Sequence, residues 1–143
     1  MHIEDVLHAK AATEVVTVGP ETGVRELLAV LAERNIGAVV VSSPADAIAG
    51  IVSERDVVRR LHLDGTVLNN TVGAIMTSSV ETCAPRDDLD AVLQTMTERR
   101  VRHLPVVDGG GLVGIVSIGD LVKHKIGQLQ FERDQLDSYL HQT

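Results

Sequence analysis

Aromatic residues are almost missing from this chain of 143 residues, which has no tryptophan, one tyrosine and one phenylalanine. Proteins that bind single-stranded nucleic acid stack the bases on aromatic side chains. A formal net charge of −7 also opposes binding to a phosphate backbone. The composition therefore excludes a nucleic-acid partner from the leading hypotheses.

Cysteine and long apolar runs are equally scarce. The single cysteine, Cys83, cannot form a disulfide within the chain. No stretch approaches the roughly 20 apolar residues of a membrane-spanning helix, and the N-terminus does not have the basic and then apolar pattern of a signal peptide. We therefore expect a cytoplasmic protein with no membrane partner, built around an aliphatic core.

Signals of catalysis are also missing. The six histidines are scattered without the spacing of a metal site, and no motif places a base beside a nucleophile. The chain has neither of the common glycine-rich phosphate loops. The sequence predicts no enzyme, no catalytic residues, no catalytic cofactor and no metal centre.

What the chain does have is a repeat. Residues 50–56 read Gly-Ile-Val-Ser-Glu-Arg-Asp, and residues 114–120 read Gly-Ile-Val-Ser-Ile-Gly-Asp, 64 positions later. Upstream, residues 17–20 (Thr-Val-Gly-Pro) match residues 82–85 (Thr-Cys-Ala-Pro) at an offset of 65. One residue has therefore been lost from the second copy, within the turn-forming segment that precedes residue 114.

Each copy has the pattern β-α-β-β-α. In the first copy the short apolar segments Val15–Val18, Gly37–Val41 and Ile48–Ser53 are typical of strands, and helical patterns follow the first and third of them. We expect an α/β (α+β) fold of two repeats, with any site between them. The expected divisions are 1–67 for the first repeat, 68–127 for the second and 128–143 for a C-terminal helical extension.

The C-terminal segment departs from the repeat, because it forms one long helical pattern from Leu121 to Leu140. Its apolar residues fall at alternating spacings of four and three, which is the spacing of a coiled-coil seam interrupted by Arg133. Two interpretations stay open. The helix packs on its own domain, or it forms a dimer or binds a partner.

The repeated motif places a serine where a strand ends and an aspartate in the first turn of the next helix. Ser53 with Asp56, and Ser117 with Asp120, have the spacing of a capping box, which is a purely structural role. A carboxylate in that position can also accept the hydroxyls of a ribose, and a helix N-terminus attracts phosphate. Capping alone does not need the preceding glycine or the apolar pair.

The ordered set of these motifs resembles a tandem pair of cystathionine-β-synthase (CBS) domains, the arrangement called a Bateman module. The resemblance covers residues 3–125 and is closest to stand-alone bacterial signal-transduction proteins. It rests on residues 17–20, 36–38 and 50–56 in the first copy and on residues 76–77, 82–85, 102–108 and 114–120 in the second.

The resemblance implies a regulatory sensor of adenosine-containing ligands, with AMP first and ADP, ATP, NAD or S-adenosylmethionine as further candidates. Two clefts would form between copies related by a pseudo-twofold axis, the serine facing phosphate and the aspartate facing ribose. The implied partners are that small molecule and a second copy of the chain, in a homodimer. One cleft would be lined by Asp120, Ser117, Thr13, Ile36, Gly37 and Ala38, and the other by Asp56, Ser53, Ser78, Val101, Arg102 and His103.

The two clefts are not expected to be equivalent. Arg102 and His103 stand where the first copy has a glycine and an alanine, and we expect them to neutralise a phosphate near Ser117. The first copy instead offers Arg55 inside its motif. The sequence thus favours tighter binding in the Asp120 cleft. The alternative is a dimerisation scaffold for a protein partner, whose clefts bind little.

Overall fold

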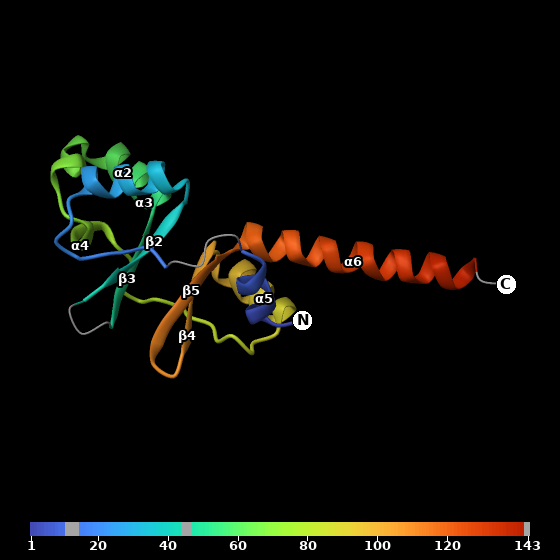
Figure 1. The fold of residues 1–143 in the computed structure, drawn as a ribbon. Coiled ribbons are helices and arrows are strands. Elements are labelled where there is room, and N and C mark those ends of the chain that lie inside the picture. The colour runs from blue at the N-terminus through green and yellow to red at the C-terminus, as the bar shows by residue number, and fades with distance from the viewer. Residues whose placement is uncertain (11–14, 44–46, 142–143) are drawn as a thin grey trace.

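The first copy of the repeat folds into the predicted order around a three-stranded sheet. The computed structural model describes residues 1–10, 15–43 and 47–141. Strand β1 runs parallel to β2, and β2 runs antiparallel to β3. Two helices pack against this sheet (Figure 1). The elements are β1 (Thr17–Val18), α2 (Val24–Arg34), β2 (Ala38–Ser42), β3 (Ile48–Ser53) and α3 (Glu54–Leu63).

The second copy repeats this architecture with a two-stranded sheet. Its first strand is reduced to one parallel bridge between Cys83 and Val106. Pro105 stands where β2 has Val40, and it has no N–H with which to extend the ladder. The elements are α5 (Leu89–Arg99), β4 (His103–Asp108), β5 (Gly111–Ser117) and α6 (Ile118–Leu140).

The strand registers confirm the repeat and the position of the missing residue. Ala38 pairs with Ser53 in one hairpin and His103 pairs with Ser117 in the other, so the offset changes within the hairpin as predicted. In the second hairpin, Gly109 and Gly110 form the turn with φ of 59° and 83°. A tight two-residue turn of this kind requires positive φ at both positions, which glycine adopts without strain.

The short helices that precede each copy are exchanged between the copies. Helix α1 (Ile3–Ala9) packs into the core of the second copy through Ile3 and Val6. Helix α4 (Val72–Ile75) packs into the core of the first copy, as does the 3-10 helix η1 (Gly65–Asn69). The division at residues 67 and 68 remains a prediction, and the two hydrophobic cores cross it. This reciprocal exchange is the packing that a pseudo-twofold pair requires.

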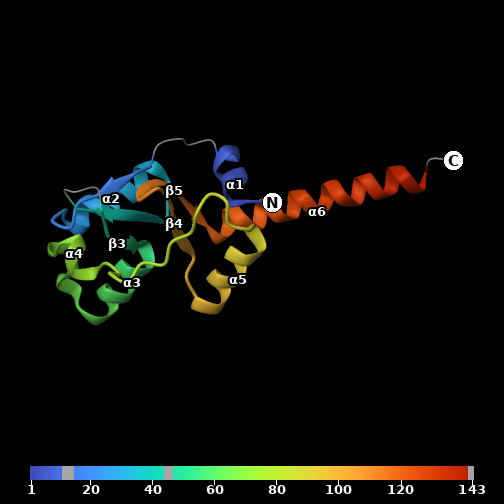
Figure 2. The same cartoon turned by 90° about the horizontal axis from the view of Figure 1, so that it is seen from below.

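Helix α6 begins inside the second copy and then leaves it. Leu121 is fully buried, whereas the apolar side chains from Val122 to Leu140 are exposed. Both views show the outer part of α6 projecting past the body of the molecule (Figures 1 and 2). The interpretation that this helix packs along its own domain is therefore wrong for its outer part, and the extension predicted to begin at residue 128 is the end of one continuous helix.

Across the three described segments of the chain, no helix has both the length and the apolar character needed to cross a membrane.

Candidate ligand-binding clefts

Both copies of the repeated motif form a capping box. The Asp56 N–H donates to Ser53 Oγ at 3.4 Å, and the Ser53 N–H donates to Asp56 Oδ2 at 2.8 Å. In the second copy the corresponding distances are 3.0 Å and 2.9 Å, between Ser117 and Asp120. The capping role is thus confirmed in both. It uses only Oδ2 of each carboxylate, and no hydrogen bond from a described residue reaches Oδ1.

The first helical amide after each serine is held by the strand that enters the same hairpin. The Glu54 N–H donates to the Gly37 carbonyl at 3.0 Å, and the Ile118 N–H donates to the Arg102 carbonyl at 2.8 Å. These equivalent bonds fix residues 36–38 and 101–103 at the N-termini of α3 and α6. Each segment is thus held beside the motif of its own copy, whereas the contacts predicted for it were with the motif of the other copy.

The glycine of the motif makes room for the exchanged segments. A Cβ added to Gly50 would lie 2.7 Å from the Thr77 carbonyl oxygen and from Met76 Sδ. A Cβ added to Gly114 would lie 2.7 Å from Leu7 Cδ2. Neither glycine has positive φ, so packing rather than backbone conformation accounts for both. This explains the part of the motif that capping does not need.

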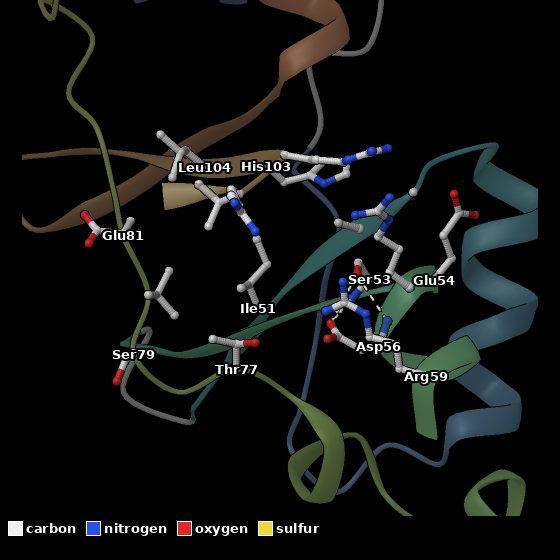
Figure 3. A pocket seen from close by; sticks show the side chains of 17 residues that line it. Ile51, Ser53, Glu54, Asp56, Arg59, Thr77, Ser79, Glu81, His103 and Leu104 are labelled. Carbon is white, nitrogen blue, oxygen red and sulfur yellow. Dashed lines mark hydrogen bonds between the residues drawn. The ribbon is translucent and has the colours of Figure 1, made fainter. Parts of the chain in front are cut away.

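The first cleft, which we call the Asp56 cleft, lies between the two copies. Its volume is about 340 Å³, within the range of small-molecule sites. Figure 3 shows β3 and the start of α3 on one side of it and the residues around His103 on the other. It is lined by Gly37, Ala38, Ile51, Ser53, Glu54, Arg55, Asp56, Arg59, Thr77, Ser79, Val80, Glu81, Arg100, Val101, Arg102, His103 and Leu104.

Four arginines line the Asp56 cleft and outnumber its three acidic residues, Glu54, Asp56 and Glu81. The arginines are Arg55, Arg59, Arg100 and Arg102. In the described ranges none of the four forms an ion pair, whereas the acidic Glu81 is paired with Arg99 at 3.5 Å. The N-terminus of α3 adds positive potential at the same place. The cleft is therefore suited to an anionic ligand.

Arg100 occupies a backbone conformation that arginine seldom adopts. It ends α5 in the left-handed region with φ of 55°, and Asn35 ends α2 in the same way with φ of 52°. Asparagine is favoured in this conformation and arginine is not. The first copy therefore has the residue that suits the turn, while the second has a cation at the edge of the Asp56 cleft.

The second cleft, which we call the Asp120 cleft, is built around an ion pair. Lys10 Nζ donates to Asp120 Oδ2 at 2.9 Å and to the Ile115 carbonyl at 2.9 Å. Each side chain of the pair is 29% exposed. Burial raises the pKa of Asp120, but the hydrogen bonds from the Ser117 amide and Lys10 outweigh it and hold the pKa below its ordinary value.

The Asp120 cleft is also the larger of the two, with a volume of about 1,100 Å³. Its lining comes from α1, the end of α2 and the second hairpin. It is formed by Glu4, Leu7, His8, Lys10, Val15, Val16, Arg34, Asn35, Ile36, Gly37, Ala38, Pro85, His103, Asp108, Val113, Gly114, Ile115, Ser117 and Asp120.

His103 lines both clefts and is half-buried between them. Its Nε2 lies 3.5 Å from the position of a Cβ on Gly37, so the imidazole is within ordinary van der Waals distance of the first copy. Burial lowers the pKa of His103, and the neighbouring carboxylates of Asp120 and Glu54 oppose this shift. A substitution of His103 is therefore expected to alter the lining of both clefts.

Most of the predicted residues line the cleft assigned to them. Thr13 lies outside the described residues. Ser78 lines neither cleft, although its neighbours Thr77 and Ser79 line the Asp56 cleft. Arg102 lines the Asp56 cleft and does not line the Asp120 cleft, so its side chain is not placed to neutralise a phosphate near Ser117, contrary to expectation.

The sequence analysis missed Lys10 and Arg100, which distinguish the two clefts. Lys10 follows α1 and approaches Asp120 only because α1 is packed on the second copy. Arg100 could have been found, because the repeat aligns it with Asn35 at the end of the preceding helix.

Comparison with known proteins agrees with this architecture. The CBS domain family matches residues 3–63 and again residues 72–127. The mitochondrial CBS domain-containing protein CBSX3 of Arabidopsis thaliana is 36% identical over 115 residues, which are 77% of this chain and 56% of that protein. The chain thus spans about half the length of that relative.

Two solved structures are similar over nearly their whole length. A CBS-domain protein of Agrobacterium tumefaciens has a TM-score of 0.83 and 38% identity, covering 87% of this chain and 99% of that one. The CBS domain pair of protein MJ0100, solved in complex with 5′-methylthioadenosine and S-adenosyl-L-methionine, has a TM-score of 0.78 and covers 90% of this chain and 98% of its own. At 22% identity the latter likeness shows the fold alone. With two matched domains, exchanged helices and a motif at the start of α3 and α6, this chain belongs to the CBS domain family as a tandem pair.

Proposed function

We propose that the chain is a regulatory sensor that binds a phosphorylated adenosine ligand in the Asp56 cleft. One observation carries the proposal: the second oxygen of the Asp56 carboxylate has no bond from any described residue, and it lies in a pocket with four unpaired arginines. A ribose and its phosphates require these two features side by side.

The cleft offers a place for each part of such a ligand. Asp56 would accept the ribose hydroxyls through Oδ1. The phosphates would lie at the N-terminus of α3, within reach of the arginines. The base would lie against apolar walls, which are provided by Ile51, Val80 and Val101.

The charge of the Asp56 cleft supports a nucleotide over other adenosine compounds. The MJ0100 domain pair binds 5′-methylthioadenosine and S-adenosylmethionine, one uncharged and the other cationic at its sulfonium. Four unpaired arginines disfavour a cationic ligand and favour phosphates. AMP is the smallest ligand that would satisfy the cleft, and ADP and ATP would engage more of the arginines.

The Asp120 cleft would bind the same class of ligand more weakly. A ribose there must compete with Lys10 for the Asp120 carboxylate, and displacing Lys10 also breaks its bond to the Ile115 carbonyl. We therefore propose the Asp56 cleft as the principal site, which reverses the preference suggested by the sequence.

Binding in the Asp56 cleft would bias the arrangement of the two copies. Its lining comes from β3 and α3 of the first copy and from residues 100–104 of the second. A ligand that contacts both favours the arrangement in which both contacts are made, in proportion to its difference in affinity. We propose this regulatory role without a catalytic step.

The test is ligand binding by the full chain, measured by thermal unfolding and by calorimetry. The ligands are AMP, ADP, ATP, S-adenosylmethionine and GTP. A ligand at about 100 times its dissociation constant adds about 2.7 kcal/mol, which raises the midpoint by roughly 5–10 °C for a chain of this size. We expect this shift with adenine nucleotides and not with GTP. A chain that responds to no adenine compound, or equally to GTP, would contradict the proposal.

Arg100→Asn makes this test more specific, because it replaces Arg100 by asparagine, the residue that the first copy has at the equivalent position, Asn35. We expect ATP affinity to fall about tenfold, the effect of one charge-assisted hydrogen bond. The unliganded chain should become more stable, because asparagine suits the left-handed turn. Arg86→Asn removes the same charge outside both clefts and is the control. Unchanged ATP binding by Arg100→Asn would show that Arg100 does not contact the ligand.

A dimerisation scaffold is the second candidate function. The observation that favours it is the exposed apolar side of α6. The nucleotide panel separates the two candidates, because a scaffold gives no shift with any nucleotide.

A further inference from the structure

The outer part of α6 is a long helix with nothing packed against it in the described chain. The helix has 23 residues, and among the described residues its last ion pair with the body is that of Lys125 with Asp90 at 3.1 Å. Beyond that point Leu129 is 51% exposed and Leu136 is 58% exposed. Isolated helical segments of about 15 residues are marginal in water, so this one needs a partner to be stable.

Apart from Phe131 and Tyr139, the exposed apolar residues of α6 form one seam. Their spacing alternates between four and three residues, which places them at the two core positions of a heptad. Phe131 is on the opposite side of the helix and does not belong to the seam. The seam consists of Val122, Ile126, Leu129, Arg133, Leu136 and Leu140.

We propose that a second copy of the chain covers this seam with its own α6, in antiparallel orientation. The first half of α6 is basic, with Lys123 and with Lys125, which is also paired with Asp90. The second half is mainly acidic. Antiparallel pairing places the basic half of each helix against the acidic half of the other, whereas parallel pairing places like charges together.

The seam also fits the antiparallel register residue by residue. Val122 then faces Leu140 of the second copy, and Ile126 faces Leu136 of the second copy. Arg133 faces Leu129 of the second copy, where its aliphatic stem covers the leucine and its guanidinium reaches water. In a parallel pair Arg133 would face Arg133 of the second copy, which is unfavourable in a seam.

The flanking charges support the same orientation. In the antiparallel register Lys123 flanks the seam beside Asp137 of the second copy, and this pair occurs twice by symmetry. Parallel pairing would instead bring Glu132 beside Asp137 of the second copy. The antiparallel register also brings Glu132 beside Glu132 of the second copy, but this single like pair is outweighed by the two Lys123–Asp137 pairs. Parallel pairing has two like pairs and no opposite one, so the charges favour a second α6 in antiparallel orientation.

The first experiment is sedimentation velocity of the full chain and of two matched variants. We expect the parent to be a dimer, and Leu129→Asp, in the centre of the seam, to shift it to monomer. Phe131→Asp is the control, because it adds the same charge on the opposite side of the same helix and should leave the dimer intact. A monomeric parent, or a dimer that survives Leu129→Asp, would overturn the proposal.

Disulfide formation then tests the orientation, since the native Cys83 is buried. Leu136→Cys alone should give no cross-linked dimer, because antiparallel pairing separates the two copies of position 136. Mixing Ile126→Cys chains with Leu136→Cys chains should give one. Cross-linking of Leu136→Cys with itself would show a parallel pair and refute the antiparallel arrangement.

Discussion

The two clefts are made from one motif, yet they present different chemistry. In both, a serine caps a helix, and one carboxylate oxygen of the aspartate accepts a hydrogen bond from the backbone N–H of that serine. In the Asp120 cleft that carboxylate also accepts a hydrogen bond from Lys10, while the Asp56 cleft is lined by four arginines that form no ion pair with any described residue. The motif alone therefore does not define a binding site, because the residues that the other segments bring to it decide what it can bind.

The source of the difference lies in the exchanged segments. Lys10 lies seven residues after Ile3, where α1 begins, and Ser79 lies seven residues after Val72, where α4 begins. Both line a cleft of the motif, but only the lysine is long enough to reach the aspartate. Lys10 thus occupies the Asp120 carboxylate, whereas the Asp56 carboxylate has no corresponding lysine beside it in the described chain.

The largest effect is expected from the motif glycines. Gly50→Ala would place a methyl group against the Thr77 carbonyl oxygen. This oxygen belongs to the backbone of the exchanged segment, which cannot move aside easily. Gly114→Ala meets only the end of the flexible Leu7 side chain. We expect about 3 kcal/mol of destabilisation for Gly50→Ala and about 1 kcal/mol for Gly114→Ala. Urea unfolding measures both, and equal losses would contradict this account of the two contacts.

A reciprocal exchange of Lys10 and Ser79 tests the comparison of the clefts directly. Ser79→Lys should bring an ammonium group to Asp56 and weaken nucleotide binding about tenfold or more, because the ribose must then displace it. Lys10→Ser should free Asp120 and add a second nucleotide per chain in a calorimetric titration.

The two variants control for each other, since each changes one charge beside one copy of the motif. Binding at the Asp56 cleft should be unchanged in Lys10→Ser. If Ser79→Lys binds nucleotide as the parent does, Lys10 is not the reason for the difference between the clefts.

The sequence predicted what local patterns determine. The repeat predicted the β-α-β-β-α order and the position of the lost residue, and the serine–aspartate spacing predicted both capping boxes. These features depend on periodicity and on residues three apart, which a single sequence records.

What the sequence could not predict depends on segments far apart in the chain. The contact of Lys10 with Asp120 joins residues 110 positions apart and exists only because α1 crosses to the second copy. Arg102 lines the Asp56 cleft to which it was assigned but not the Asp120 cleft, where it was also expected to contact a phosphate, although its carbonyl lies beside Ser117. Both outcomes are decided by how the two copies pack together.

The smallest effect is expected at His103, which lines both clefts, and it concerns the pH dependence of stability. Because burial lowers the pKa of His103, its neutral form is favoured in the folded chain. As the pH falls below the ordinary value of 6.5, the unfolded chain takes up a proton first, so stability is complete above that pH and declines below it. His103→Ala installs the residue of the first copy, Ala38, and should flatten the stability profile between about pH 7 and pH 5.

The contribution of Asp120 lies in a different pH range and provides the internal control. Its lowered pKa means that the ion pair with Lys10 stabilises the fold above the ordinary value of 3.8 and is lost only as the pH falls through the lower folded value. Urea unfolding across the range therefore separates the two groups, because His103→Ala changes the slope near neutrality and Lys10→Ser changes it only in acid. If His103→Ala leaves the slope between pH 7 and pH 5 unchanged, the imidazole between the clefts is not held in its neutral form by burial.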